Sequence, residues 1–176
     1  SSQLFAANNW PIKLNKFKKI KTLDASYTQL KKIKSLDISL KSNGRLLLSV
    51  PNYFEWRIFS TKNLKYVFKS NEIHFYEDDM KVKKILNSQI DSVLLNPIKT
   101  LRAWLRLDKE FIQEMFKIKT LTSNQYQFTP KDEKDLFRSI IIKVGKKSPI
   151  DEIVLNEKNG DSMSFVFSNT KISYEK

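Results

Sequence analysis

The pattern of apolar residues starts with a helical period and then changes to the alternation of a strand. In the segment 10–20 the apolar residues recur on one helical face, with lysines on the other. Pro11 suits the first turn of such a helix. Over 23–30 apolar residues alternate with small or polar ones, as in a half-buried strand. We therefore expect an N-terminal helix that gives way to a strand near Thr22.

A hairpin is predicted next. Apolar residues alternate over 36–40, and the segment 45–50 returns as a mostly apolar strand. Between them, Asn43-Gly44 supplies the positive φ angles that tight hairpin turns require. The pattern places the turn at 41–44. Short alternating segments then predict a meander of further strands over 53–59, 64–68, 73–76 and 81–85.

The middle of the chain returns to helical spacing. Asn96 and Pro97 are typical of the N-cap and first turn of a helix, and Asp108 can cap a second short helix that carries apolar residues up to Phe116. After Lys117 strands are predicted again, at 126–128, 137–144, 150–156 and 163–167.

Long runs of consecutive strands without βα alternation argue against a doubly wound parallel sheet. A meander of about ten strands curls, and its concave apolar face needs a cover, which the helices can provide. We therefore predict an α+β fold in which a curved antiparallel sheet forms an unclosed β-barrel, with a helical lid over an apolar cavity. The length of 176 residues favours one domain spanning 1–176.

Charge leaves several interpretations open. The formal net charge is +13, and only five of the 32 basic residues are arginine. A basic surface can serve nucleic acid, an anionic membrane or an acidic partner, or it can be a solvated exterior. Base and phosphate recognition rely on arginine, and the lysine pairs are dispersed along the chain, so we expect no nucleic-acid partner.

Residues that could carry catalysis are scarce. His74 is the one histidine and there is no cysteine. Two-histidine metal sites, thiol nucleophiles and disulfides are thereby excluded. The three glycines are scattered and form no phosphate-binding loop. We expect neither an enzyme nor a bound cofactor or metal. The first ten residues lack the features of a signal peptide, so we expect an exported protein to have lost its signal already.

Several motifs, in order, resemble the LolA family of outer-membrane lipoprotein carriers. They are the strand from Leu23 that contains Ala25-Ser26-Tyr27-Thr28-Gln29, the Gly44-Arg45-Leu46 strand, Pro51-Asn52-Tyr53-Phe54-Glu55-Trp56, the Phe75-Tyr76 pair, Asn96-Pro97-Ile98, and the strand Tyr126-Gln127-Phe128-Thr129-Pro130-Lys131. Each motif alone is weak, but their order covers most of the chain.

The resemblance implies a monomeric periplasmic carrier. Such a protein holds the acyl chains of lipoproteins, or of related lipids, in an apolar cavity. It receives them from an inner-membrane ABC transporter and delivers them to an outer-membrane acceptor. Two cavity-lining residues and two lid residues are implied by position, and two more extend the lid face at helical spacing; together they are Phe54, Trp56, Ile98, Leu101, Trp104 and Leu105. Ordinary core packing explains the same six residues.

Two departures from the family pattern indicate a divergent member. Val50 stands where the family has an arginine that bonds to the lid. The family's terminal "Phe-x-Phe-x-x-Pro" strand is also not found after Phe167. The resemblance therefore leaves room for an outer-membrane lipoprotein receptor of the LolB type, and for a lipid-sensing or adaptor module on the same fold.

Overall fold

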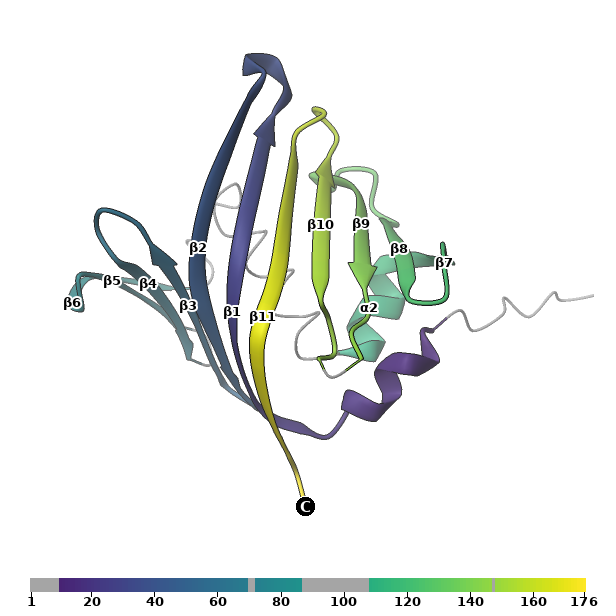
Figure 1. The fold of residues 1–176 in the computed structure, drawn as a ribbon, viewed down its shortest axis with the longest axis horizontal. Helices are drawn as coiled ribbons and strands as arrows, with labels where there is room; N and C mark the ends of the chain where they lie inside the picture. Colours follow the sequence, from purple (N-terminus) through teal and green to yellow (C-terminus); the bar gives the residue numbers. More distant parts are fainter. Residues whose placement is uncertain (1–9, 70–71, 87–107, 147) are drawn as a thin grey trace, which may run out of the picture.

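The structure is a computed structural model that describes residues 10–69, 72–86, 108–146 and 148–176. These residues form one antiparallel sheet of eleven strands with short helices beside it (Figure 1). The strands are β1 (Ile20–Ile33), β2 (Ile38–Ser49), β3 (Tyr53–Phe59), β4 (Leu64–Lys69), β5 (Glu72–Glu77), β6 (Met80–Leu86), β7 (Phe116–Thr120), β8 (Gln125–Pro130), β9 (Phe137–Lys143), β10 (Glu152–Glu157) and β11 (Ser162–Tyr174).

The sheet is curved and unclosed. Its spatial order is β6-β5-β4-β3-β2-β1-β11-β10-β9-β8-β7, so β6 and β7 form its two edges. The first and last strands, β1 and β11, pair at the centre and join two meanders into one surface (Figure 1). The predicted fold class is confirmed, with eleven strands in place of about ten.

Almost all of the buried apolar residues of the strands lie on the concave side, where they make one continuous core. In β1, for example, Leu23, Ala25 and Tyr27 are buried, while the residues between them are partly exposed. Because side chains alternate across a strand, the period of two in the sequence becomes one buried face of the sheet. The same core includes residues from both meanders, such as Phe68 of β4 and Phe128 of β8.

The N-terminal helix is a 3-10 helix, η1 (Ile12–Phe17), and β1 begins at Ile20. The predicted helix is therefore shorter and the strand starts earlier than expected. Ile20 is buried as part of the sheet, because pairing with β11 outweighs the helical spacing. Leu14 and Phe17 are buried in the common core, so the apolar stripe that predicted a helix is still the face that packs.

The second predicted helix is α2 (Lys109–Met115), and the predicted cap is confirmed. The side chain of Asp108 accepts a hydrogen bond from the backbone nitrogen of Phe111 (3.1 Å). Ile112 of α2 is fully buried. Lys109 Nζ lies 5.7 Å from the ring centre of Trp10, so the starts of α2 and η1 lie close together. Both helices lie at the end of the sheet near β8 and β9 (Figure 1). No helix of the described residues is long and apolar enough to span a membrane.

The predicted hairpin turn at 41–44 is wrong. Strand β2 runs unbroken through Asn43 and Gly44, and the chain reverses earlier, in the 3-10 turn η2 (Lys34–Leu36). Asp37 adopts the left-handed conformation there (φ 52°), which short polar side chains tolerate. The Asn-Gly pair gave a local turn signal, but the long antiparallel pairing of β1 with β2 overrides it.

The helix predicted to begin at Asn96, with the lid positions Ile98, Leu101, Trp104 and Leu105, falls outside the described residues. Strand β7 was not predicted. Phe116, expected at the end of α2, is instead its first residue. The last strand, β11, is also longer than expected and continues to Tyr174 alongside β1.

Candidate functional site

An aromatic cluster lies at the centre of the concave face. The rings of Tyr27 and Trp56 stack with centroids 4.3 Å apart, and Phe165 meets both edge-on, at 6.0 and 5.5 Å. Phe54 extends the cluster along β3, 6.2 Å from Trp56, and its other neighbour is Phe68 at 5.6 Å. All five rings are almost completely buried. Offset and edge-to-face contacts of this kind stabilise the fold beyond the burial of their area.

The cluster joins the two meanders. Tyr27, Trp56 and Phe165 come from β1, β3 and β11, which are adjacent or nearly so only because β1 pairs with β11. Trp56 and Phe54 are on the same side of β3, two residues apart, and Phe54 is directly opposite Leu48 of β2. The result is a broad aromatic and aliphatic surface made of non-polar side chains from several strands.

Tyr27 carries the one hydroxyl of this cluster, and that hydroxyl is satisfied. Its Oη donates a hydrogen bond to the main-chain oxygen of Arg57 (2.6 Å). Burial raises the pKa of the Tyr27 phenol far above its ordinary value, so the group stays neutral well above physiological pH. Gly44 is opposite Tyr27 in β2, and a Cβ there would clash with both Tyr27 Oη and Arg57 O. The concave face therefore presents no charge at its centre.

Phe54 and Trp56, predicted from the sequence to line a cavity, lie side by side in this cluster. Their role in binding stays a prediction, because the positions also belong to the core. Tyr27, Phe68 and Phe165 were not singled out as site residues, although each follows the alternation of its strand. Their grouping could have been found only by knowing that β11 pairs with β1.

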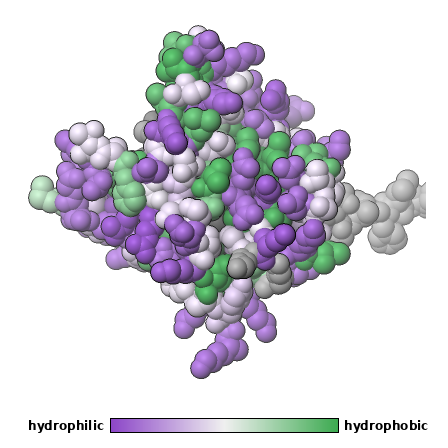
Figure 2. All heavy atoms as spheres, in the orientation of Figure 1, coloured by the Kyte–Doolittle hydropathy of each residue, from purple (hydrophilic) through white to green (hydrophobic). Residues whose placement is uncertain are grey.

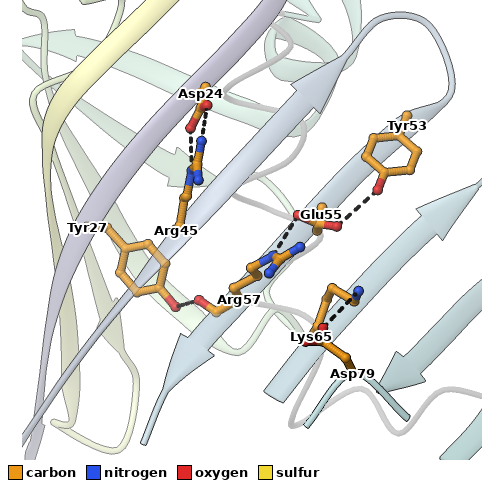
Figure 3. A network of polar contacts seen from close by, with 8 residues as sticks. All are labelled: Asp24, Tyr27, Arg45, Tyr53, Glu55, Arg57, Lys65 and Asp79. Carbon is orange, nitrogen blue, oxygen red and sulfur yellow. Dashed lines mark hydrogen bonds and ion pairs between the residues drawn. The ribbon is translucent and has the colours of Figure 1, made fainter. Parts of the chain in front are cut away.

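The convex face of β1 to β4 carries a polar network (Figure 3). Arg45, Arg57 and Lys65 are consecutive partners across β2, β3 and β4, so three cations form one row. Each has its own carboxylate. Arg45 bonds to Asp24 through both Nε to Oδ1 (2.7 Å) and Nη2 to Oδ2. Arg57 Nε lies 2.9 Å from Glu55 Oε2, and Lys65 Nζ lies 3.5 Å from Asp79 Oδ1.

Asp24 and Tyr53 in this network have shifted pKa values. The hydrogen bond from Arg45 holds the pKa of Asp24 below its usual value. Burial, and then the hydrogen bond to Glu55 (3.0 Å), raises the pKa of Tyr53 to about 12. Glu55 is 8% exposed and bridges Tyr53 and Arg57. The network neutralises a row of like charges on the outside of the sheet and stands apart from the aromatic surface inside.

Val50, which stands where the family pattern has an arginine, directly follows the β2 strand. Its backbone nitrogen donates to Lys21 O (3.0 Å), and its side chain packs against the core. It also lines a groove of about 580 Å³ with Lys21, Thr22 and the last residues, 173–176. His74, the one histidine, pairs with Glu72 (3.0 Å) on β5. No group of three metal-ligating side chains occurs among the described residues.

A curved, unclosed antiparallel sheet with an apolar concave face is the architecture that the sequence motifs led us to expect. The family model described as "Outer membrane lipoprotein carrier protein LolA" matches residues 18–175. That range includes all eleven strands. The chain therefore belongs to the LolA family.

Curated relatives carry the same description. The chain is 23% identical over 163 residues to an outer-membrane lipoprotein carrier protein of Francisella tularensis subsp. novicida, covering 90% of this chain and 75% of the relative. The proteins of the same name from subspecies tularensis and holarctica match with the same figures.

Among solved structures, a LolA superfamily protein from Nitrosomonas europaea aligns over 94% of each chain, with a TM-score of 0.46 and 8% identity. The Mycobacterium tuberculosis lipoprotein LppX aligns over 94% of this chain and 96% of its own, with a TM-score of 0.43 and 8% identity. At these scores neither structure supports a further conclusion, and the family membership depends on the sequence match.

Proposed function

We propose that this protein is a periplasmic carrier that takes the acyl chains of lipoproteins, or of related lipids, into the apolar interior of its curved sheet. The observation that carries the proposal is the buried, uncharged aromatic surface formed by Tyr27, Phe54, Trp56 and Phe165 on the concave face. Membership of a family described as lipoprotein carriers supports the same function. No chemical step is part of it, so we propose a carrier and not an enzyme.

The energetics fit this role. Burial of one CH₂ group is worth about 0.8 kcal/mol, so a single long acyl chain gains on the order of 10 kcal/mol before the losses of binding. A charged or unsatisfied polar group facing the acyl chain would oppose that gain in binding free energy. The hydroxyl of Tyr27 is bonded to Arg57 O and avoids this penalty.

In the proposed cycle the protein, a monomer and a single LolA-like domain, carries its cargo from an inner-membrane ABC transporter to an outer-membrane acceptor. Phe54 and Trp56 line the cavity in this proposal, and Ile98, Leu101, Trp104 and Leu105 form the inner face of the lid. Because Val50 replaces the family arginine, the lid is held without that charge-assisted bond, which would contribute about 1.5–3 kcal/mol.

Quenching of tryptophan fluorescence by fatty acids with a nitroxide on the acyl chain tests the proposal directly. The chain has three tryptophans, and we expect saturable quenching in which Trp56→Phe removes the largest share. Trp10→Phe is the control, because Trp10 is buried next to Asn15 and Lys109 and not in the aromatic cluster. A folded protein without saturable quenching, or with quenching unaffected by Trp56→Phe, would contradict the proposal.

The lid assignment has its own test. Trp104→Glu should abolish retention of the fatty acid while the circular dichroism spectrum stays that of the wild-type protein, because a carboxylate opposes burial of the acyl chain. Retention at the wild-type level in the folded variant would remove Trp104 from the lid. Recovery of the protein from its host under mild conditions, followed by mass spectrometry, would identify the cargo.

A further inference from the structure

The hairpin of β1 and β2 carries an exposed apolar tip. Leu36 in the turn is 64% exposed, and Ile38 and Leu40 of β2 are 42% and 52% exposed. The hairpin is the part of the sheet that extends furthest at the upper side of Figure 1. Figure 2 shows apolar atoms next to strongly polar ones at that tip. Exposed apolar residues that lie together at one projecting point are a feature of interaction sites.

Lysines flank the apolar tip on both strands of the hairpin. Lys31, Lys32, Lys34 and Lys41 lie within a few residues of Leu36, and Asp37 is the one carboxylate in the segment 31–41. Lys32, Lys34 and Lys41 are exposed. Lysine can lay its aliphatic stem along an apolar surface and keep its ammonium group in water. By the register of the hairpin, Lys32 and Lys41 lie on the face away from Ile38 and Leu40, so charge and apolar side chains meet at one projecting end. Positive charge beside exposed leucine and isoleucine matches a surface that is anionic outside and apolar beneath.

The backbone of the tip is already hydrogen-bonded within the hairpin. Pairing of β1 with β2 continues to Ile33 opposite Ile38, and the turn is closed by Asp37 N donating to Lys34 O (3.2 Å). Lys34 N donates to Asp161 Oδ1 (2.9 Å) in the neighbouring β10-β11 turn. A segment with paired backbone groups can enter a lipid interface without exposing unpaired polar atoms to it.

We propose that this hairpin tip docks the protein on an anionic phospholipid bilayer, with Leu36, Ile38 and Leu40 in the interface and the lysines at the level of the lipid phosphates. The occupant is a lipid surface because both the apolar residues and the charges are complementary to it. A neutral protein partner would leave the lysines without a counterpart.

The position of the tip links it to the concave face. Ile38 and Leu40 are in phase along β2 with Gly44, Leu46 and Leu48, so they continue the inner face of the sheet beyond its buried part. If the protein carries acyl chains, as proposed above, docking at this tip would bring the rim of the carrier surface against the membrane. The docking proposal itself does not require any cargo.

Vesicle flotation tests the proposal with the intact, cargo-free protein. We expect binding to vesicles of phosphatidylcholine with phosphatidylglycerol, weakened by high salt, and much less binding to phosphatidylcholine alone. Leu36→Asp should weaken binding by roughly tenfold or more, since it removes an apolar side chain and adds a like charge to the lipid. Leu121→Asp is the control, because Leu121 is 40% exposed in the turn between β7 and β8.

A second pair of variants separates local charge from net charge. Lys32→Glu with Lys41→Glu should weaken binding by roughly tenfold to a hundredfold at low salt. Lys117→Glu with Lys119→Glu makes the same change of net charge at two exposed residues of β7. This control pair should keep most of the binding to anionic vesicles. Equal losses from the two pairs would overturn docking at the tip and indicate attraction by the whole surface.

The depth of the hairpin tip in the bilayer can be measured with a fluorophore on one introduced cysteine, because the chain has no cysteine of its own. Ser35→Cys labelled with an environment-sensitive dye should shift to the blue on anionic vesicles, whereas labelled Ser123→Cys should not. A blue shift at Ser123 alone, or none at Ser35 while the protein binds, would overturn the proposal. Leu36→Asp should keep saturable quenching by nitroxide fatty acids in solution, so failure of docking and failure of the carrier function remain distinguishable.

Discussion

The ring of Tyr27 lies against Gly44 of the neighbouring strand, and its hydroxyl reaches past that glycine to the main-chain oxygen of Arg57 at 2.6 Å. The absence of a side chain at Gly44 is what allows a tyrosine of β1 to bond to the backbone of β3 across β2. This arrangement also sets the stacking of Tyr27 on Trp56.

Gly44→Ala should therefore destabilise the fold by about 1–3 kcal/mol, because the new methyl group clashes with Tyr27 Oη and with Arg57 O, which is backbone and cannot rotate away. Urea unfolding followed by circular dichroism measures the change. Asn43→Ala is the control, since Asn43 is exposed, and it should change the free energy of unfolding by less than about 0.5 kcal/mol. An unchanged midpoint for Gly44→Ala would contradict this account of the glycine.

Alkaline pH should lower stability through Tyr27. Its pKa is raised by burial, so above the ordinary value of about 10 the unfolded chain loses the proton while the folded protein keeps it. The free energy of unfolding then falls as pH rises from that point. Tyr27→Phe should lower the free energy of unfolding by about 0.5–1.5 kcal/mol at neutral pH, because the hydrogen bond to Arg57 O is lost. Above pH 10 the free energy of unfolding of this variant should fall less steeply than that of the wild-type protein. If urea unfolding shows the same dependence of the free energy of unfolding on pH for both proteins, Tyr27 is not the cause of the alkaline loss of stability.

Glu55 should stabilise the fold by accepting hydrogen bonds from both Tyr53 and Arg57. Glu55→Ala leaves Arg57 and Tyr53 without this carboxylate. It should lower the free energy of unfolding, measured in urea, by about 1–3 kcal/mol. Glu55→Gln has the same shape without the charge, and should lower the pKa of Tyr53 from about 12 toward its ordinary value. Because burial is the larger cause, part of the shift should remain. Absorbance at 295 nm, compared with Tyr53→Phe, isolates this tyrosine; an unchanged titration would exclude an effect of Glu55.

The cap of α2 gives a local prediction. Asp108→Ala removes the acceptor for Phe111 N and should destabilise the protein by about 1 kcal/mol, because the helix has only seven residues and few other ways to satisfy its first turn. Asp108→Asn keeps a capping oxygen and should therefore retain most of the stability that Asp108→Ala loses. Thermal unfolding of the three proteins measures both effects, and equal losses for Ala and Asn would show that the cap is not the cause.

The sequence predicted the strands with an apolar face most successfully. In β1, β3, β8 and β10 a period of two results directly from one buried face and one solvent-facing face of the strand, and it can be recognised without knowing which strand is the partner. The cap at Asp108 was predictable for the same reason, since its hydrogen bond spans three residues.

Errors came where a distant contact outweighs a local preference. Asn43-Gly44 has the composition of a turn, yet the packing of Tyr27 requires a glycine inside β2, and the turn lies at 34–37. Ile20 has helical spacing, yet pairing with β11 places it in a strand. Strand β7 was missed because Phe116 follows α2 without any break in the apolar pattern.

The sequence by itself determined the alternating strands, the open antiparallel sheet and the family motifs that point to a carrier, since all of these depend on neighbouring residues or on motif order. Only the tertiary structure decided that β11 returns to pair with β1, that Tyr27, Trp56 and Phe165 meet, and that the β1-β2 hairpin projects with Leu36 exposed. The physical reason is that these features depend on strand pairing between opposite ends of the chain, and a local pattern fixes the face of a strand but not its partner.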